Sequence, residues 1–140
     1  MSLASKSVNV TINKTPYIIT PHPAMQALKL IRRIGSHIKV DGVKIDSLDM
    51  DAQINSLAII GKVASAFCQY SEEHDPELTL MSDLFKYTQV NVNGKQTSVM
   101  NVFDDHYAGN WNELIQAITE VLKVNNFLQM LNPTGSQIGE

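Results

Sequence analysis

The residues best suited to chemistry are spread thinly along this chain of 140 residues. Its four histidines fall in four different segments, without the spacing that metal-binding motifs use. The best local cluster is Asp104-Asp105-His106, but adjacent residues of a helix or strand point in different directions and can hardly face one ion. We interpret the cluster as a solvated loop or helix end and predict no metal site. Catalysis would need distant residues to converge, drawn from His22, His37, His106 and the Asp104/Asp105 pair.

Nucleophilic and acid–base chemistry have no better candidates. Cys68, the only cysteine, has no basic residue close by in the sequence to lower its thiol pKa, so we expect a small buried hydrophobe. Glu72, Glu73 and Asp75 precede a proline and are expected to form a solvated connection, not a catalytic pair. The seven glycines are scattered, which argues against a phosphate-binding loop. The sequence therefore predicts a protein that is not an enzyme and holds no cofactor.

Composition narrows the class of protein further. Eleven Lys and Arg against fourteen Asp and Glu give a net charge of −3, which disfavours binding to nucleic acid. The apolar runs are too short to span a membrane, and residues 1–7 lack the apolar core of a signal peptide. We expect a single globular, intracellular domain over residues 1–132 and a flexible polar tail at 133–140.

The elements that would position these residues are predicted from periodicity. Val8, Val10 and Ile12 alternate with polar residues as in a half-buried strand, and 17–19 could return as its hairpin partner. A helix is expected to begin near Ala24 and to end at Gly35. Its apolar stripe comprises Ala24, Ala27, Leu28, Ile31 and Ile34. Asp41-Gly42 is a hairpin turn signal, with a loop as the alternative.

The middle of the chain has the clearest helical period. A long helix is expected to begin at a cap at Ser47 or Asp49 and to run through Tyr70, with a break over 71–76. A shorter helix should follow over 77–86. Asn93-Gly94 is the strongest hairpin signal in the chain. The segment 99–106 fits either a strand or a helix.

The last helix is predicted from a cap at Asn110 and from Glu113 three residues later, a variant of the capping box. Its apolar face could extend as far as Leu131, before Pro133 stops it. The sum of these elements is an α+β domain of about four helices with one or two small antiparallel β-hairpins.

Apolar residues on this last helix are the candidates for partner binding. Trp111, the only tryptophan, lies in the first turn, off the face that carries Leu114 and Ile118. Tryptophan is enriched at interaction surfaces, although Trp111 could also cover the helix end against the domain's own core. Phe127 and its neighbours put apolar groups on more than one side of the helix end. We expect Trp111, Leu114, Ile118 and Phe127 to contact a partner.

The segment from Phe103 to Asn110, followed by Leu114, Val121-Leu122, Val124-Asn125 and Phe127, resembles the bacteriophage tail assembly chaperones. Those small proteins often show an aromatic residue, a glycine and a helix that ends in a Val-x-x-Asn-Phe-like stretch. Here Asn126 intrudes before Phe127. The order of the expected elements over residues 8–130 is similar as well.

The resemblance implies a non-enzymatic protein that binds the tape measure protein, a long and mostly helical chain that sets tail length. It would keep this client soluble until tail-tube subunits polymerise around it. The resemblance also implies a homo-oligomer, a longer form of the chain made by frameshifting, action in the host cytoplasm and absence from the mature virion. The alternative is a virion structural protein, such as a tail completion or adaptor subunit, whose hairpins add strands between neighbours.

Overall fold

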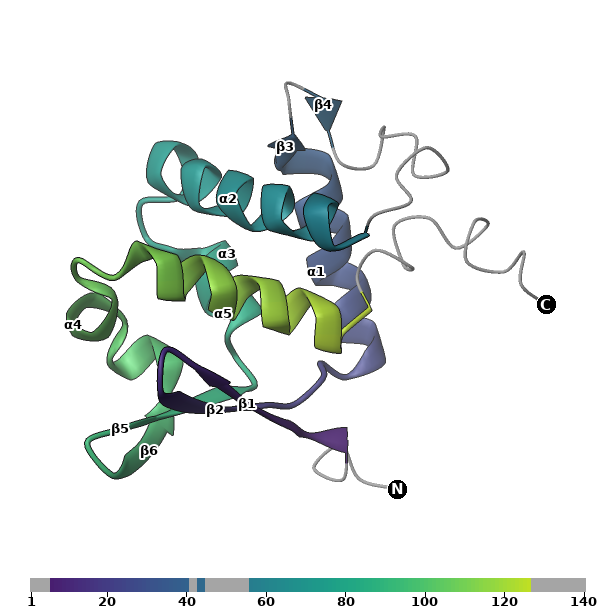
Figure 1. The fold of residues 1–140 in the computed structure, drawn as a ribbon. Helices are drawn as coiled ribbons and strands as arrows, with labels where there is room; N and C mark the ends of the chain where they lie inside the picture. Colours follow the sequence, from purple (N-terminus) through teal and green to yellow (C-terminus); the bar gives the residue numbers. More distant parts are fainter. Residues whose placement is uncertain (1–5, 41–42, 45–55, 127–140) are drawn as a thin grey trace.

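Two hairpins that are far apart in the sequence form one antiparallel sheet in the computed structural model, which describes residues 6–40, 43–44 and 56–126 (Figure 1). The first hairpin comprises β1 (Val8–Ile12) and β2 (Thr15–Ile19), and the second comprises β5 (Thr88–Val92) and β6 (Lys95–Ser98). β2 pairs with β5, which places Tyr17 opposite Val90 and gives the strand order β1-β2-β5-β6. Both predicted hairpins are therefore confirmed, and they share a sheet.

The turns of these hairpins follow from the residues that occupy them. Asn13 and Lys14 both have positive φ, at 50° and 69°, and Asn93 and Gly94 have φ of 55° and 80°. Two successive residues with positive φ form the tight turn whose twist matches the strands on either side. Asparagine and glycine reach this conformation at the lowest cost, whereas Lys14 carries a strain of about 1–2 kcal/mol.

Helix α1 (Ala24–His37) buries a stripe that differs from the predicted one. Leu30 and Gly35 are buried with Ala27, Ile31 and Ile34, whereas Ala24 is exposed and Leu28 is 47% exposed. The buried positions are three or four residues apart, so they share one face that Leu28 does not join. The helix also continues past Gly35, contrary to the prediction, and ends where Ile38 turns to an extended conformation.

The next elements confirm the hairpin predicted near Asp41-Gly42 over the alternative of a loop. Strands β3 (Lys39–Val40) and β4 (Val43–Lys44) pair antiparallel, while the turn itself lies outside the described residues. Helix α2 (Ser56–His74) follows, and its predicted cap at Ser47 or Asp49 also lies outside them. The helix runs through 71–73, so the predicted break at Ser71 is wrong. Pro76 sets the true end because it disfavours helical geometry at the preceding residue.

Asp75 corrects a second prediction, since it is buried and not part of a solvated connection. Its Oδ1 accepts hydrogen bonds from the backbone N–H and the hydroxyl of Thr79, at 3.1 and 2.9 Å. Its Oδ2 accepts one from the N–H of Leu80 at 2.8 Å. These are the unpaired donors at the start of helix α3 (Thr79–Leu84), which Asp75 therefore caps from outside the helix.

We expect Asp75→Asn to lower the free energy of unfolding by about 1–2 kcal/mol at neutral pH, the usual contribution of a capping residue. Burial opposes ionisation of Asp75, but the hydrogen bonds from Leu80 and Thr79 outweigh it and hold the pKa of this carboxyl below its usual range. The stabilisation is thus complete above the unfolded-state pKa, about 4, and is lost as the pH falls through the lower pKa of the folded chain. Urea unfolding of both proteins at neutral and at acid pH measures this, and a difference that does not shrink in acid would contradict it.

The chain between the sheet and the last helix is helical. A 3-10 turn, η4 (Val99–Asn101), leads into α4 (Phe103–Tyr107), which resolves the ambiguity of this segment. Helix α5 (Trp111–Val124) ends before Leu131, contrary to the predicted extension. Asn125 ends it by donating from its side chain to the carbonyl of Val121 at 2.9 Å, and by accepting from the backbone N–H of His22 at 2.7 Å. Asn126 then turns the chain with a φ of 54°.

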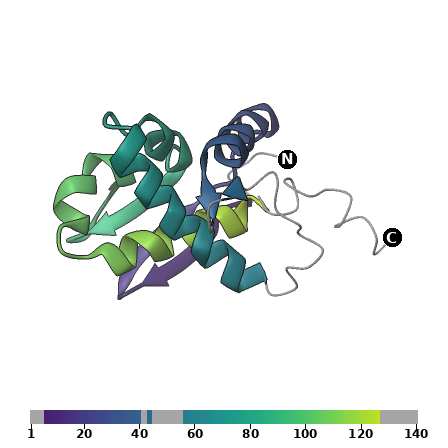
Figure 2. The same cartoon turned by 90° about the horizontal axis from the view of Figure 1, so that it is seen from above.

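The helices lie in layers on one face of the sheet. Helix α5 lies between the sheet and α2 (Figure 1), and Figure 2 shows α2 running across α5 with α1 to one side. The core between these layers is filled by the largest buried side chains, which are Tyr17, Phe67, Phe85, Ile19, Ile34, Ile38, Leu80, Met81, Leu84 and Leu114. The arrangement is an α+β domain with five α-helices in the described residues. In that part of the chain, no helix has the length and apolar character needed to cross a membrane.

Candidate functional site

The histidines named as candidates for catalysis occupy separate environments. His22 is buried, and its Nε2 donates to the backbone carbonyl of Asp83 at 2.8 Å. His37 is exposed and stacks on Tyr70 with ring centroids 5.8 Å apart. His106 contacts Glu113 on α5. Within the residues that the structure describes, no three His, Cys, Asp or Glu side chains are grouped so that they could hold a metal ion.

His106 and its two acidic neighbours on α4 point in different directions. Asp104 and Asp105 are exposed, whereas His106 places its Nε2 2.5 Å from Oε2 of Glu113 on α5. Glu113 is 1% exposed, so its carboxylate is held inside the protein and needs partners. The three adjacent side chains of the cluster therefore do not converge on one point.

Two tyrosines complete a buried polar cluster around Glu113. The hydroxyl of Tyr17 donates to Oε2 of Glu113 at 2.6 Å, and the hydroxyl of Tyr107 lies 2.8 Å from that of Tyr17. Burial raises the pKa of Tyr107 to about 12, and burial together with the bond to Glu113 raises that of Tyr17 further. Both tyrosines therefore stay protonated as donors. The cluster ties β2, α4 and α5 together at one point.

Glu113 also explains why the predicted capping box does not form. Asn110 precedes α5, but its side chain makes no capping hydrogen bond to the helix backbone. Instead, Nδ2 of Asn110 donates to Oε1 of Glu113 at 3.1 Å. Sequence spacing identified the right pair of residues, yet the buried hydroxyl of Tyr17 and the ring of His106 redirect Glu113 away from the backbone.

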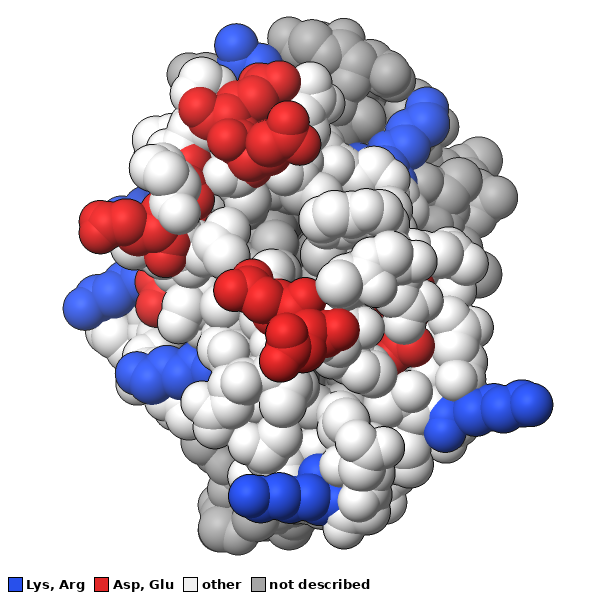
Figure 3. Space-filling model, turned by 90° about the vertical axis from the view of Figure 1, so that its left-hand side faces the viewer, with Lys and Arg blue, Asp and Glu red and all other residues white. Residues whose placement is uncertain are grey.

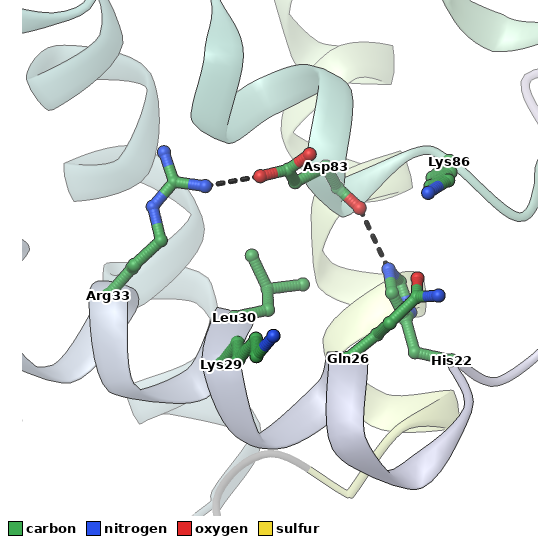
Figure 4. A pocket seen from close by; sticks show the side chains of 7 residues that line it. All are labelled: His22, Gln26, Lys29, Leu30, Arg33, Asp83 and Lys86. Atoms are coloured by element: carbon green, nitrogen blue, oxygen red, sulfur yellow. Dashed lines mark hydrogen bonds and ion pairs between the residues drawn. The ribbon is translucent and has the colours of Figure 1, made fainter.

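A hollow of about 180 Å³ lies between α1 and α3, next to His22 (Figure 4). Arg33 on α1 forms an ion pair with Asp83 on α3 at one side of it. The bond from His22 to the carbonyl of Asp83 closes the other side. Because these polar groups pair with one another, we interpret the hollow as part of the contact between α1 and α3. Its lining comprises His22, Gln26, Lys29, Leu30, Arg33, Asp83 and Lys86.

A larger and mainly apolar pocket, of about 490 Å³, opens between α2, α3, α4 and α5. We call it the Trp111 pocket. Its volume falls in the range of about 300–1,000 Å³ typical of binding sites. Cys68 in its wall is half-buried, whereas the sequence predicted a buried residue. Desolvation raises the pKa of its thiol to about 11, so the thiol is uncharged and contributes apolar surface. The lining residues are Cys68, Gln69, Ser71, Glu72, Leu78, Met81, Phe103, Trp111 and Leu114.

Trp111 stands at the edge of this pocket with 65% of its surface exposed. The alternative that it covers the helix end against the domain's own core is therefore wrong. An exposed tryptophan beside an apolar hollow is a large amphipathic contact surface of the kind that dominates protein interfaces. The geometry favours the docking of an apolar segment of another chain.

One backbone feature and one side-chain feature are also found at the Trp111 pocket. Leu78 holds a left-handed conformation with φ 56° and ψ 38°, which is costly for a branched side chain and is typical of functional sites. The hydroxyl of Ser71 is buried in the pocket wall and has no hydrogen-bond partner among the described residues.

The four predicted partner-binding residues fall into three groups. Trp111 is exposed at the pocket. Leu114 lines the pocket floor but is 1% exposed, and Ile118 is wholly buried in the core, so neither offers free surface. Phe127 lies outside the described residues. Sequence reasoning missed Leu78, Met81 and Phe103, because they come from other elements and only the fold brings them to Trp111.

Comparison with known proteins gives one match. A family model described as phage tail assembly chaperone protein, TAC, matches residues 13–132 of the chain. The match covers well over half of the chain and includes every element from β2 to α5. No curated protein and no solved structure matches the chain.

Proposed function

Since this chain belongs to the phage tail assembly chaperone family, we propose that it binds the tape measure protein and keeps it soluble until tail-tube subunits polymerise around it. The observation that carries the proposal is the exposed Trp111 beside an apolar pocket. A long helical client exposes apolar stripes, and a stripe of this kind can lay its side chains into such a pocket.

The proposed mechanism is reversible covering of apolar surface. A single pocket of this size holds only a few side chains, so each contact is modest and can be displaced by the growing tail tube. Several copies along one client would supply the total affinity. In this proposal the chain acts in the host cytoplasm as a homo-oligomer or with a longer frameshifted form of itself, breaks no covalent bond and is absent from the finished virion.

Co-expression with the tape measure protein of the same phage tests the proposal. We expect the chain to raise the soluble fraction of the tape measure protein and to co-purify with it. Unchanged solubility together with no complex would contradict the proposal. Mass spectrometry of purified phage particles separates the virion alternative, since a structural subunit would be recovered from them and a chaperone would not.

A further inference from the structure

One carboxylate lines the Trp111 pocket, that of Glu72. Two more exposed carboxylates, Glu77 and Asp104, are adjacent in the sequence to the lining residues Leu78 and Phe103. We call these three the border carboxylates. Figure 3 faces this side of the molecule and shows groups of acidic side chains near its centre, near its top and at its left edge, with the basic side chains mainly around the margin. No Lys, Arg or His lines the pocket in the part of the chain that the structure describes.

Among the residues that the structure describes, these carboxylates have no cation of their own. Within the described residues, the Asp and Glu side chains that form ion pairs are Asp83, Glu73, Glu113 and Glu120. Glu72, Glu77 and Asp104 form none there. Their negative charges therefore act on whatever approaches the pocket. Glu72 is on α2, Asp104 is on α4, and Glu77 is in the connection between α2 and α3.

The negative charge of the border carboxylates favours a partner segment that carries positive charge. Exposed charges at the rim of an interface contribute little to affinity individually, but they repel like charges and attract opposite ones during approach.

Resting on the proposed function, we infer that the segment held at the Trp111 pocket is an amphipathic helix whose apolar stripe is flanked by Lys and Arg. The apolar side chains at successive turns enter the pocket beside Trp111 and Met81. The flanking cations face the border carboxylates and stay solvated.

Two synthetic peptides test this inference. They carry the same leucine stripe at helical spacing and no tryptophan, and they differ only in flanking residues, which are lysine in one and glutamate in the other. Trp111 is the only tryptophan of the chain, so its emission reports binding at the pocket. We expect the lysine peptide to bind about tenfold more tightly at low ionic strength, and the preference to shrink at about 0.5 M salt.

Variants of the full chain show whether the border carboxylates cause the preference. We expect the double variant Glu72→Gln with Asp104→Asn to lose most of it, because this change neutralises charges on α2 and α4. Glu120→Gln is the matched control, since Glu120 on α5 pairs with Lys123 and does not line the pocket. The control should keep the full preference.

Three results would overturn the inference. Equal binding of the two peptides with a change in Trp111 emission would remove the charge preference and leave the proposed function standing. A preference that the double variant retains would show that the border carboxylates do not cause it. No emission change with either peptide would also exclude the pocket as the client site, and co-expression with the tape measure protein would then test the chaperone role alone.

Discussion

Trp111→Ala is expected to weaken binding of the tape measure protein at least about tenfold, because an exposed tryptophan at the centre of an interface commonly contributes about 2 kcal/mol or more. The fold should not change. Trp111 is 65% exposed and stands at the start of α5, where alanine is well tolerated. The free energy of unfolding should therefore stay within about 0.5 kcal/mol of the original. Affinity of the purified chain for tape measure fragments, and urea unfolding of the same samples, measure the two quantities.

Met25→Ala is the matched control for this experiment. Met25 is 64% exposed, as Trp111 is, but it lies on α1 and does not line the pocket. The control should bind the client as the original chain does. Equal weakening by both substitutions would point to non-specific apolar contact. A loss of stability by Trp111→Ala that matched its loss of binding would make Trp111 a structural residue.

Glu113→Ala is expected to lower the free energy of unfolding by about 3 kcal/mol, because removing the buried carboxyl group leaves its hydrogen-bond partners unsatisfied. The partners left behind are the hydroxyl of Tyr17, the ring of His106 and the side chain of Asn110. The side chains of Glu113 and His106 are 2% and 13% exposed, so water cannot easily replace the lost bonds. Urea unfolding followed by circular dichroism measures the loss.

Two further substitutions calibrate this result. Glu113→Gln keeps an oxygen for Tyr17 and should cost less than the alanine variant. Glu120→Ala removes a more exposed glutamate from the same helix and should change stability by less than about 1 kcal/mol. If Glu113→Ala cost no more than Glu120→Ala, the buried cluster would not hold α4 and α5 together.

The buried cluster bears on binding as well as on stability. Through His106, Glu113 fixes α4, and α4 begins with Phe103, which forms one wall of the Trp111 pocket. The buried cluster thus fixes the helix that contributes this wall of the pocket. The exposed residues at the edge of the pocket can change without disturbing this cluster.

Local signals in the sequence were enough to predict most of the helices and strands. Asn93-Gly94 has the turn residues that a two-residue hairpin requires, and alternation of Val8, Val10 and Ile12 marks an edge strand with one buried face. Long-range pairing has no such signal. The contact of β2 with β5 joins Tyr17 to Val90, and Asp75 caps α3 only because the chain turns sharply after α2.

The residues of the candidate site also divide into those that local sequence signals identify and those that only the fold brings together. Trp111 was identifiable because it is a large residue placed off the apolar face of its own helix. Leu114 and Ile118 lie on that face, so they are in the core, and periodicity alone could not separate an interface from a core. Leu78, Met81 and Phe103 needed the fold, because they reach Trp111 from two other segments, α3 with its N-cap and α4.

We propose that the chain shields an apolar stripe of the tape measure protein at the Trp111 pocket. The most direct test of this proposal is the soluble yield of the tape measure protein in cells that make the original chain, Trp111→Ala or Met25→Ala at equal levels. We predict high yield with the original chain and with Met25→Ala, and aggregation with Trp111→Ala. Equal solubility with all three proteins would contradict the account.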